Sequence, residues 1–240
     1  MSKNMVRLNK YLADCGICSR READKMIDAG RVLVNGITAT MGYQVQETDS
    51  VSFNGKIVEN KNSKVVLAFY KPVGVTCTEK DKYADQTITD YLNYPIRITY
   101  AGRLDKDSEG LIIMTNDGEL INRMMRAANK HEKEYLVKVD KEITPHFLAQ
   151  MSKGVYLKDL EETTRECQVT SVGKFSFRII LTQGLNRQIR RMCKTLGYEV
   201  KLLQRIRIMN IEIGTLQSGE YRELAGKEIE TLYESVGLKI

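Results

Sequence analysis

The sequence predicts an α+β protein built from two domains, and three observations lead to this prediction. Segments with helical and strand periodicity do not alternate strictly, which argues against a doubly wound sheet. The chain has 240 residues, enough for a small domain and a medium-sized one. Residues 59–64 are polar and contain no apolar side chain. We therefore expect one domain over residues 1–60, a linker over residues 61–64 and a second domain over residues 65–240.

The composition is ordinary for a soluble globular protein. Charged residues make up 28% and hydrophobic residues 42% of the chain, and no apolar run approaches the roughly 20 residues of a membrane span. The N-terminal residues show no signal-peptide pattern. The five cysteines are an odd number at irregular spacing, which fits reduced thiols better than a disulfide framework. We expect a cytoplasmic protein with no membrane partner.

The first domain carries signals for two helices and two hairpins. Residues 8–15 place apolar side chains at helical spacing, and Gly16 ends that helix. Ser19 and Glu22 form a capping-box pattern that begins a second helix, which stops at Gly30. Asn-Gly pairs at residues 35–36 and 54–55 are typical of two-residue hairpin turns.

Cys15 and Cys18 form a CxxC pair, the spacing of half a zinc site. The other three cysteines are scattered and the chain has two histidines, so no second ligand pair follows. A helix end with a connecting turn is the simpler interpretation, and we expect no bound metal.

The second domain begins with a buried strand over residues 65–70 and a turn over residues 71–74. Asp117 is a good N-cap for a helix with Leu120, Ile121, Met124 and Met125 on one face. The other expected elements are helices near residues 88–92 and 144–153 and strands over residues 96–100, 111–115, 133–140, 167–172 and 175–182.

A polar turn over residues 102–110 separates two apolar, β-branched runs. It holds three carboxylates, Asp105, Asp107 and Glu109, beside the cation Arg103. This layout places an acid at the end of a strand, where a rigid scaffold can hold it, and a carboxylate beside a cation stays ionised and can act as nucleophile or base. The alternative is a charged hairpin loop without chemistry.

Positive charge is concentrated between residues 186 and 207. Seven Lys and Arg side chains stand there against one carboxylate, Glu199, so this segment alone matches the +6 net charge of the chain. Residues 186–197 predict a helix with an unbroken apolar stripe, with Arg190 at its border and Arg187, Arg191 and Lys194 opposite. A solvated helix face is the usual meaning of such a run, but concentration in one segment indicates a polyanionic partner, most simply nucleic acid.

Several motifs resemble known families. The sequences RLNKYL at residues 7–12, CSRREAD at residues 18–24 and GRVLVNG at residues 30–36 resemble the S4 RNA-binding domain. Three segments resemble motifs of bacterial RNA pseudouridine synthases of the RsuA/RluB/RluE/RluF branch: GRLDKDSEGL at residues 102–111, KEYLV at residues 133–137 and GLNRQIRRM at residues 184–192. The sequences of the last two motifs resemble the RluF group most. The resemblance runs from about residue 5 to residue 235.

The resemblance implies a catalytic domain with a central mixed, largely antiparallel sheet flanked by helices, and an activity that isomerises uridine to pseudouridine. It implies that Asp105 is the nucleophile, that Tyr135 stacks on the uracil of a flipped-out uridine, and that Arg190 pairs with Asp105 and holds it ionised. Arg103 resembles the arginine that fills the gap left by the extruded base. The reaction changes no oxidation state and requires no energy input, so no cofactor is expected.

The implied partner is ribosomal RNA, most simply 23S ribosomal RNA or its large-subunit precursor, with transfer RNA left open as a second substrate. We expect a monomer. The side chains expected to contact RNA are Arg7, Lys10, Arg20, Arg21, Lys25, Arg31, Arg103, Arg187, Arg191, Lys194, Arg205 and Arg207.

Two other functions stay open at this stage. The chain could bind ribosomal RNA or assist ribosome assembly without catalysis. Alternatively, Asp105 could form a hydrolytic acid/base couple with Asp107 or Glu109, which would release free uracil. Whether Asp105 attacks the ribose or C6 of uracil also stays open.

Overall fold

A computed structural model describes residues 5–59, 63–78, 86–126 and 130–239, and the chain divides into two compact units. The first unit contains the residues up to Val65 together with the short segments Tyr94–Ile98 and Asn116–Gly118. Part of the linker expected over residues 61–64 lies outside the described residues. Each unit has its own hydrophobic core.

The first unit forms the two helices and two hairpins that its sequence predicts. Ser19 accepts the hydrogen bond of the Glu22 amide, and the Glu22 carboxylate accepts that of the Ser19 amide, which completes the capping box. The Asn-Gly turns have positive φ at both residues, as a two-residue hairpin turn requires. The elements are β1 Val6–Arg7, α1 Leu8–Asp14, α2 Arg20–Asp28, β2 Val32–Val34, β3 Ile37–Thr38, β4 Gln44–Val45, β5 Val51–Phe53 and β6 Lys56–Ile57.

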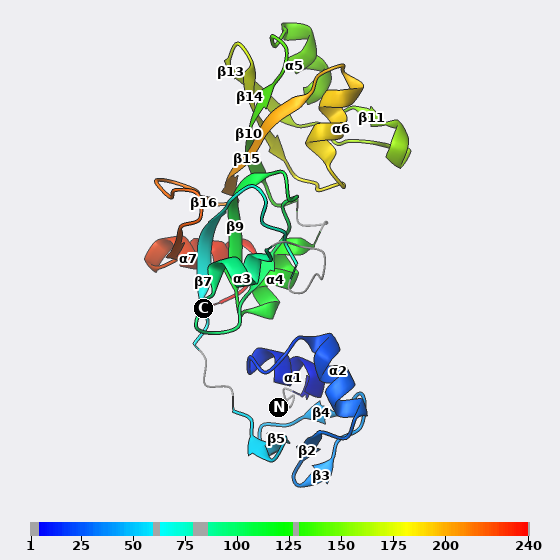
Figure 1. Ribbon diagram of the computed structural model, residues 1–240, viewed down its shortest axis with the longest axis vertical. Coiled ribbons are helices and arrows are strands. Elements are labelled where there is room, and N and C mark those ends of the chain that lie inside the picture. Colours follow the sequence, from blue (N-terminus) through cyan, green and yellow to red (C-terminus); the bar gives the residue numbers. More distant parts are fainter. Residues whose placement is uncertain (1–4, 60–62, 79–85, 127–129, 240) are drawn as a thin grey trace. The chain divides into compact units, whose positions relative to one another are not determined.

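The second unit is organised around a nine-stranded sheet, which is mixed and largely antiparallel as expected (Figure 1). Among the described strands of this sheet, only β9 and β15 pair in parallel. The strand order is β13 Gln168–Gly173, β14 Ser176–Leu181, β10 Lys133–Val139, β15 Val200–Ile208, β9 Glu109–Thr115, β7 Val66–Lys71 and β17 Tyr221–Glu223, with β8 Thr99–Ala101 on β9 and β16 Ile211–Glu212 on β15.

Helices cover this sheet in two groups, each with its own core (Figure 1). In one group Phe147 and Met192 pack against apolar side chains of β10 and β14. In the other Leu120 and Leu232 pack against β7 and β9. The remaining elements are α3 Ile88–Leu92, α4 Gly118–Met125, α5 Pro145–Ser152, β11 Tyr156–Leu157, η2 Lys158–Leu160, β12 Glu162–Thr163, α6 Gln188–Thr195 and α7 Gly226–Ser235. No helix in the described part of the chain is long and apolar enough to cross a membrane.

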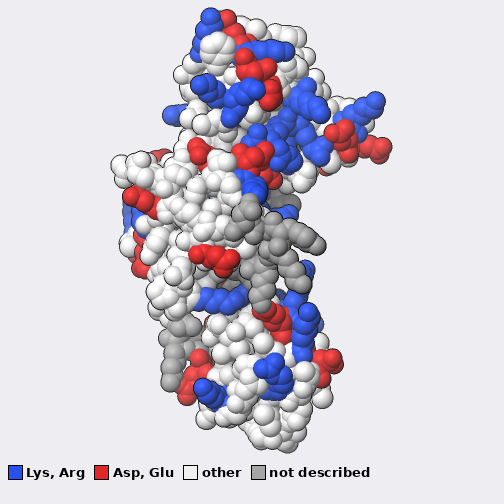
Figure 2. All heavy atoms as spheres, viewed as in Figure 1, with Lys and Arg blue, Asp and Glu red and all other residues white. Residues whose placement is uncertain are grey.

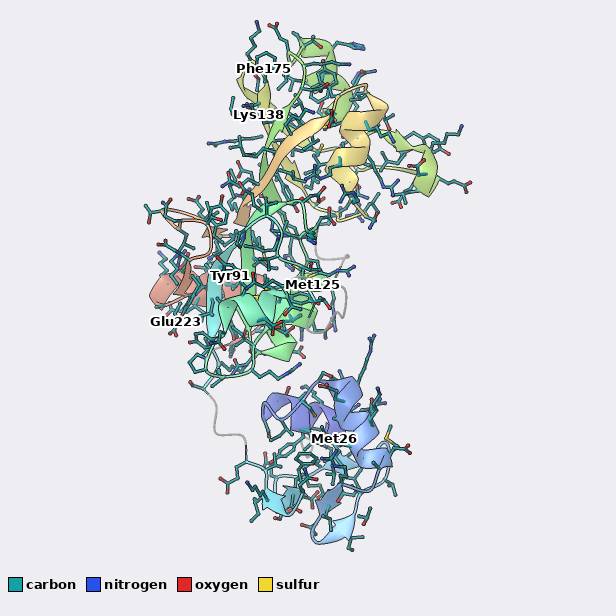
Figure 3. All side chains as sticks on the ribbon, in the orientation of Figure 1. Met26, Tyr91, Met125, Lys138, Phe175 and Glu223 are labelled. Carbon is teal, nitrogen blue, oxygen red and sulfur yellow. The ribbon has the colours of Figure 1, made fainter. Side chains whose placement is uncertain are left out.

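Three sequence expectations need correction. The basic helix begins at Gln188, because Arg187 is its N-cap residue with φ 50° and ψ 35°, so a helical projection does not place the Arg187 side chain. The elements expected from the sequence end at residue 197, so β15, which lies in the centre of the sheet, was not among them. Met125, labelled in Figure 3, is 48% exposed rather than buried with Leu120 and Met124.

Gly110 sets the spacing at the parallel pair of strands. It has φ 106°, and a Cβ atom there would lie 2.3 Å from the backbone oxygen of Arg205, its partner in β15. No side chain can occupy that space without moving one strand. The start of β9, just after the polar turn that contains Asp105, and the centre of the sheet therefore depend on this glycine.

We expect Gly110→Ala to lower the free energy of unfolding by at least about 2 kcal/mol, because backbone strain and a backbone clash both oppose the new methyl group. Urea denaturation of purified protein measures this change. Gly173→Ala is the matched control, since its Cβ would meet only the Ser176 side chain at 4.0 Å. Equal losses in the two variants would contradict the close approach of β9 and β15.

Candidate active site

The acidic loop over residues 102–108 joins β8 to β9 and is held by its backbone. The Ser108 amide donates to the Asp105 carbonyl at 3.1 Å, which closes a turn around the acid, and the Gly74 amide donates to the Lys106 carbonyl at 2.8 Å. The Leu104 amide donates to the Cys77 sulfur at 3.4 Å. The strand–loop–strand layout predicted around Asp105 is confirmed, and its loop has a fixed conformation.

A cavity of about 520 Å³ opens beside this loop, within the size range of small-ligand sites. Asp105 and Arg103 of the loop line it, together with Tyr135 of β10 and the segment that leads into α6. Met125 of α4, labelled in Figure 3, also lines it. The structure thus brings three of the predicted site residues, Asp105, Tyr135 and Arg103, to one cavity.

The cation beside Asp105 is Arg187 rather than Arg190. Arg187 Nη1 lies 3.6 Å from Asp105 Oδ2. Arg190 Nη2 instead donates to the Asp107 carbonyl at 2.7 Å and to Ser108 Oγ at 3.2 Å, and its Nε lies 3.4 Å from Asp107 Oδ2. The expected pair of Arg190 with Asp105 is therefore wrong. Arg187 has a left-handed backbone conformation and its side chain lies next to Asp105, whereas Arg190, about one helical turn later, contacts Asp107 and Ser108.

Asp107 forms a bidentate pair with Arg187, with donor–acceptor distances of 3.1 and 2.7 Å. These hydrogen bonds lower the pKa of the Asp107 carboxyl, so it is charged at neutral pH. Glu109 accepts a hydrogen bond from the Tyr70 hydroxyl at 3.1 Å, and neither acid lines the cavity. The arrangement does not favour a hydrolytic couple, since such a couple needs a protonated partner across the substrate from Asp105.

Tyr135 lies on the cavity face of β10, directly opposite Arg205 of β15 in the strand register. Its ring is partly buried and belongs to the edge of the core formed with Phe147. Cys77 also lines the cavity, but burial raises the pKa of its thiol, so it is protonated and a poor nucleophile at neutral pH. Asp105 is therefore the better candidate for nucleophilic attack in the cavity.

Two arginines expected to bind RNA are engaged within the fold. Arg205 is 2% exposed, and its Nε donates to the Leu111 carbonyl at 2.7 Å. Arg207 donates to the carboxylates of Glu134 at 2.9 Å and Glu132 at 3.0 Å. Neither is a free surface cation: Arg205 is buried, although it also lines the cavity, and the carboxylates of Glu134 and Glu132 pair with Arg207.

Other basic residues remain at the surface. Figure 2 shows Lys and Arg side chains gathered over the part of the molecule that carries α6. Lys194 is exposed there, and Arg191 pairs with Asp159 at 2.7 Å. In the first unit Arg7, Arg20, Arg21, Lys25 and Arg31 are exposed, while Lys10 lies 3.9 Å from Asp14. The S4-like cations and the cavity belong to different units.

Sequence reasoning missed Lys133, which lines the cavity from the first position of β10. The sequence could have indicated this position, because Lys133 is two residues before Tyr135 and side chains two residues apart lie on the same face of a strand. Leu181 and Leu203, from the strands on either side of β10, line the cavity as well.

Metal ligation finds no support in the described residues, which contain no group of three or more His, Cys, Asp or Glu side chains able to hold an ion. Cys15 and Cys18 are buried in the core of the first unit. Burial raises the pKa of the Cys15 thiol to about 11, which disfavours the thiolate that a metal would bind.

Comparison with known proteins agrees with this geometry. Residues 65–195 match the family described as RNA pseudouridylate synthase, and residues 6–51 match the S4 domain. The chain is 49% identical over 233 residues to the dual-specificity RNA pseudouridine synthase RluF of Escherichia coli, covering 96% of this chain and 79% of that protein. It is 35% identical to ribosomal large subunit pseudouridine synthase B of Bacillus subtilis, covering 95% and 96%.

A solved structure supports the same assignment. The crystal structure of a pseudouridylate synthase superposes with a TM-score of 0.70 at 28% identity, covering 95% of this chain and 99% of that one. The sequence matches and the superposition each extend over nearly the whole chain, S4-like unit included. The chain therefore belongs to the RsuA family of RNA pseudouridine synthases, with an S4 domain joined to a pseudouridine synthase domain.

Proposed function

We propose that this enzyme isomerises a uridine of 23S ribosomal RNA and that Asp105 is its nucleophile. One observation carries the proposal: Asp105 and Tyr135 line the same cavity, and the Arg187 guanidinium lies 3.6 Å from the Asp105 carboxylate. The relative from Bacillus subtilis is named for the large ribosomal subunit, which supports that RNA as the substrate.

In the proposed reaction the uridine leaves its stack and its base enters the cavity. The Tyr135 ring replaces the lost stacking, since an aromatic side chain can face any base. Asp105 bonds to C1′ of the ribose or to C6 of the uracil, the base turns, and C5 attaches to C1′. Arg103 is exposed at the cavity and is suited to occupy the gap in the RNA.

Arg187 and Arg190 receive different roles from those the sequence predicts. Arg187 pairs with Asp105 and Asp107 and stabilises the charged nucleophile. Arg190 is a positioning residue, because it donates to the carbonyl of Asp107 and to Ser108 rather than to the nucleophile. A small displacement of the loop would move Asp105 away from the ribose, and misplacement by about 1 Å can cost about 100-fold in rate.

Binding of the RNA is assigned to both parts of the chain. The S4-like domain, which we place at residues 1–60, presents the exposed Arg7 before α1 and the exposed cations of α2, and Lys194 and Arg191 add a second basic surface on α6. The catalytic domain is placed at residues 65–240. We propose action as a monomer in the cytoplasm, with transfer RNA as a second substrate, consistent with the dual specificity named for the Escherichia coli relative.

Substrate choice is tested with transcripts that carry tritium at C5 of uridine, because attachment of C5 to the ribose releases that tritium. We expect release from 23S ribosomal RNA, with transfer RNA tested in parallel and 16S ribosomal RNA as the control. Carbodiimide mapping of the product then identifies the modified uridine. Release from 16S ribosomal RNA alone would contradict the proposed substrate, and free uracil in place of pseudouridine would indicate hydrolysis.

Asp105→Asn should lower tritium release by at least about 10⁴-fold, since an amide is a very poor nucleophile. Affinity for the RNA, measured by filter binding, should stay within about twofold. Glu109→Gln is the control from the same acidic cluster and should retain most of the activity, because Glu109 does not line the cavity and its carboxylate accepts a hydrogen bond from Tyr70. Turnover by Asp105→Asn at the wild-type rate would show that another group attacks, or that the isomerisation needs no covalent step at this acid.

Arg187→Ala and Arg190→Ala should each lower the single-turnover rate by about 10- to 100-fold, and Arg190→Lys should recover part of the loss. Lys194→Ala should leave that rate unchanged but weaken RNA binding and reduce the slope of log affinity against log salt by about 1. Rates and affinities are measured on the same transcript. A pure affinity defect in Arg190→Ala would refute its positioning role.

A further inference from the structure

Lys133 has an unusual position in the cavity. It lies at the start of β10 and lines the same cavity as Asp105 and Tyr135. The side chain is only partly exposed, and its ammonium forms no hydrogen bond or ion pair with any of the described residues. A lysine in such a position normally pairs with a carboxylate or extends into water.

The surroundings of Lys133 add positive charge rather than neutralise it. Arg205 is buried on the neighbouring strand β15, and its Nη2 has no hydrogen-bond partner among the described residues. Burial, together with the charge of Arg205, lowers the pKa of Lys133. Asp105, the acid of the cavity, already pairs with Arg187. Among the described residues, this partly desolvated cation therefore has no anionic partner, an arrangement that costs stability and favours a ligand with negative charge.

We propose that the Lys133 ammonium donates a hydrogen bond to a carbonyl oxygen of the uracil and stabilises the negative charge that forms on the base during isomerisation. This inference rests on the proposed function of the cavity. It adds a second catalytic group. Asp105 forms the covalent bond to the ribose or to C6, whereas Lys133 stabilises the charge that develops on a carbonyl oxygen of the uracil.

The charge follows from the bonds that change. When an Asp105 oxygen bonds to C1′, the C1′–N1 bond breaks and its electron pair stays on the uracil, delocalised from N1 onto O2 and O4. When C5 attacks C1′, the bond to Asp105 breaks, N1 takes up a proton and C5 loses one to solvent. If Asp105 instead adds to C6, the displaced electron pair reaches O4. Both routes place negative charge on a carbonyl oxygen, and Lys133 remains protonated throughout.

The test uses Lys133→Met, which keeps the length of the side chain and removes its charge. The single-turnover rate at saturating enzyme should fall by about 100-fold or more, as when one oxyanion donor is removed from an active site. The melting temperature should rise, because an unpaired cation leaves a partly buried position. Loss of rate together with a gain in stability is not the signature of a merely structural residue.

Lys138→Met is the matched control. Lys138 lies on the same strand but is exposed and does not line the cavity. In Figure 3 it lies far from Met125, which does line the cavity. Its replacement should change neither the single-turnover rate nor the melting temperature. A rate loss in this variant equal to that of Lys133→Met would assign the effect to general charge and overturn the proposal.

A second measurement does not depend on the folding of any variant. RNA with 2-thiouridine or 4-thiouridine at the target position presents sulfur, a weaker hydrogen-bond acceptor, in place of one carbonyl oxygen. At least one substitution should slow the wild-type enzyme by about 10-fold or more, and that effect should disappear in Lys133→Met. Equal thio effects in both enzymes, or none in the wild type, would overturn the proposal.

Two further outcomes separate this inference from the proposed function. If Lys133→Met weakens RNA affinity but keeps the wild-type rate at saturation, Lys133 contacts phosphate and the proposal fails while the proposed function stands. If the wild-type enzyme releases no tritium from any RNA, the proposed function itself fails, and the inference that rests on it fails as well.

Discussion

The conformation of the acidic loop over residues 102–108 depends on arginines that are distant from it in the sequence. Arg205 donates to the carbonyls of Leu111 at 2.7 Å and Arg103 at 3.4 Å, and Arg190 donates to that of Asp107 at 2.7 Å. Charge-assisted hydrogen bonds to carbonyls on both sides of Asp105 fix the backbone that carries it. A loop at a strand end would otherwise be among the more mobile parts of a fold. The position of the acid therefore depends on the formation of β15 and α6.

This arrangement places cations where a fold optimised for stability alone would have none. Arg205 is buried in the centre of the sheet, and Lys133 on the neighbouring strand has no hydrogen-bond or ion-pair partner among the described residues. The two apolar cores of this unit, around Leu120 and around Phe147, supply the stability that permits this. Buried or partly buried charges that lower stability are typical of positions where a protein binds a ligand or catalyses a reaction.

The charged segment from residue 186 to residue 207 performs three tasks. Arg190 and Arg205 donate hydrogen bonds to backbone carbonyls in or next to the acidic loop. Other cations pair with carboxylates, among them Arg187 with Asp107 and Arg207 with Glu134. Lys194 stays exposed to solvent. The local excess of +6 thus overstates the charge available to RNA, because hydrogen bonds within the fold occupy much of it.

The sequence by itself determined the fold class, most of the helices and strands up to residue 197, and the family. These follow from local signals such as the Ser19 capping box, the Asn-Gly turns and the strand–loop–strand layout around Asp105. Only the tertiary structure decided which cation meets which acid. The backbone at Arg187 adopts a left-handed conformation that no helical projection anticipates, and β15 reaches β9 only across about a hundred residues of chain. Strand pairing of that kind depends on long-range contacts, so spacing within a segment could not show that Arg205 faces inward or that Lys133 shares its cavity.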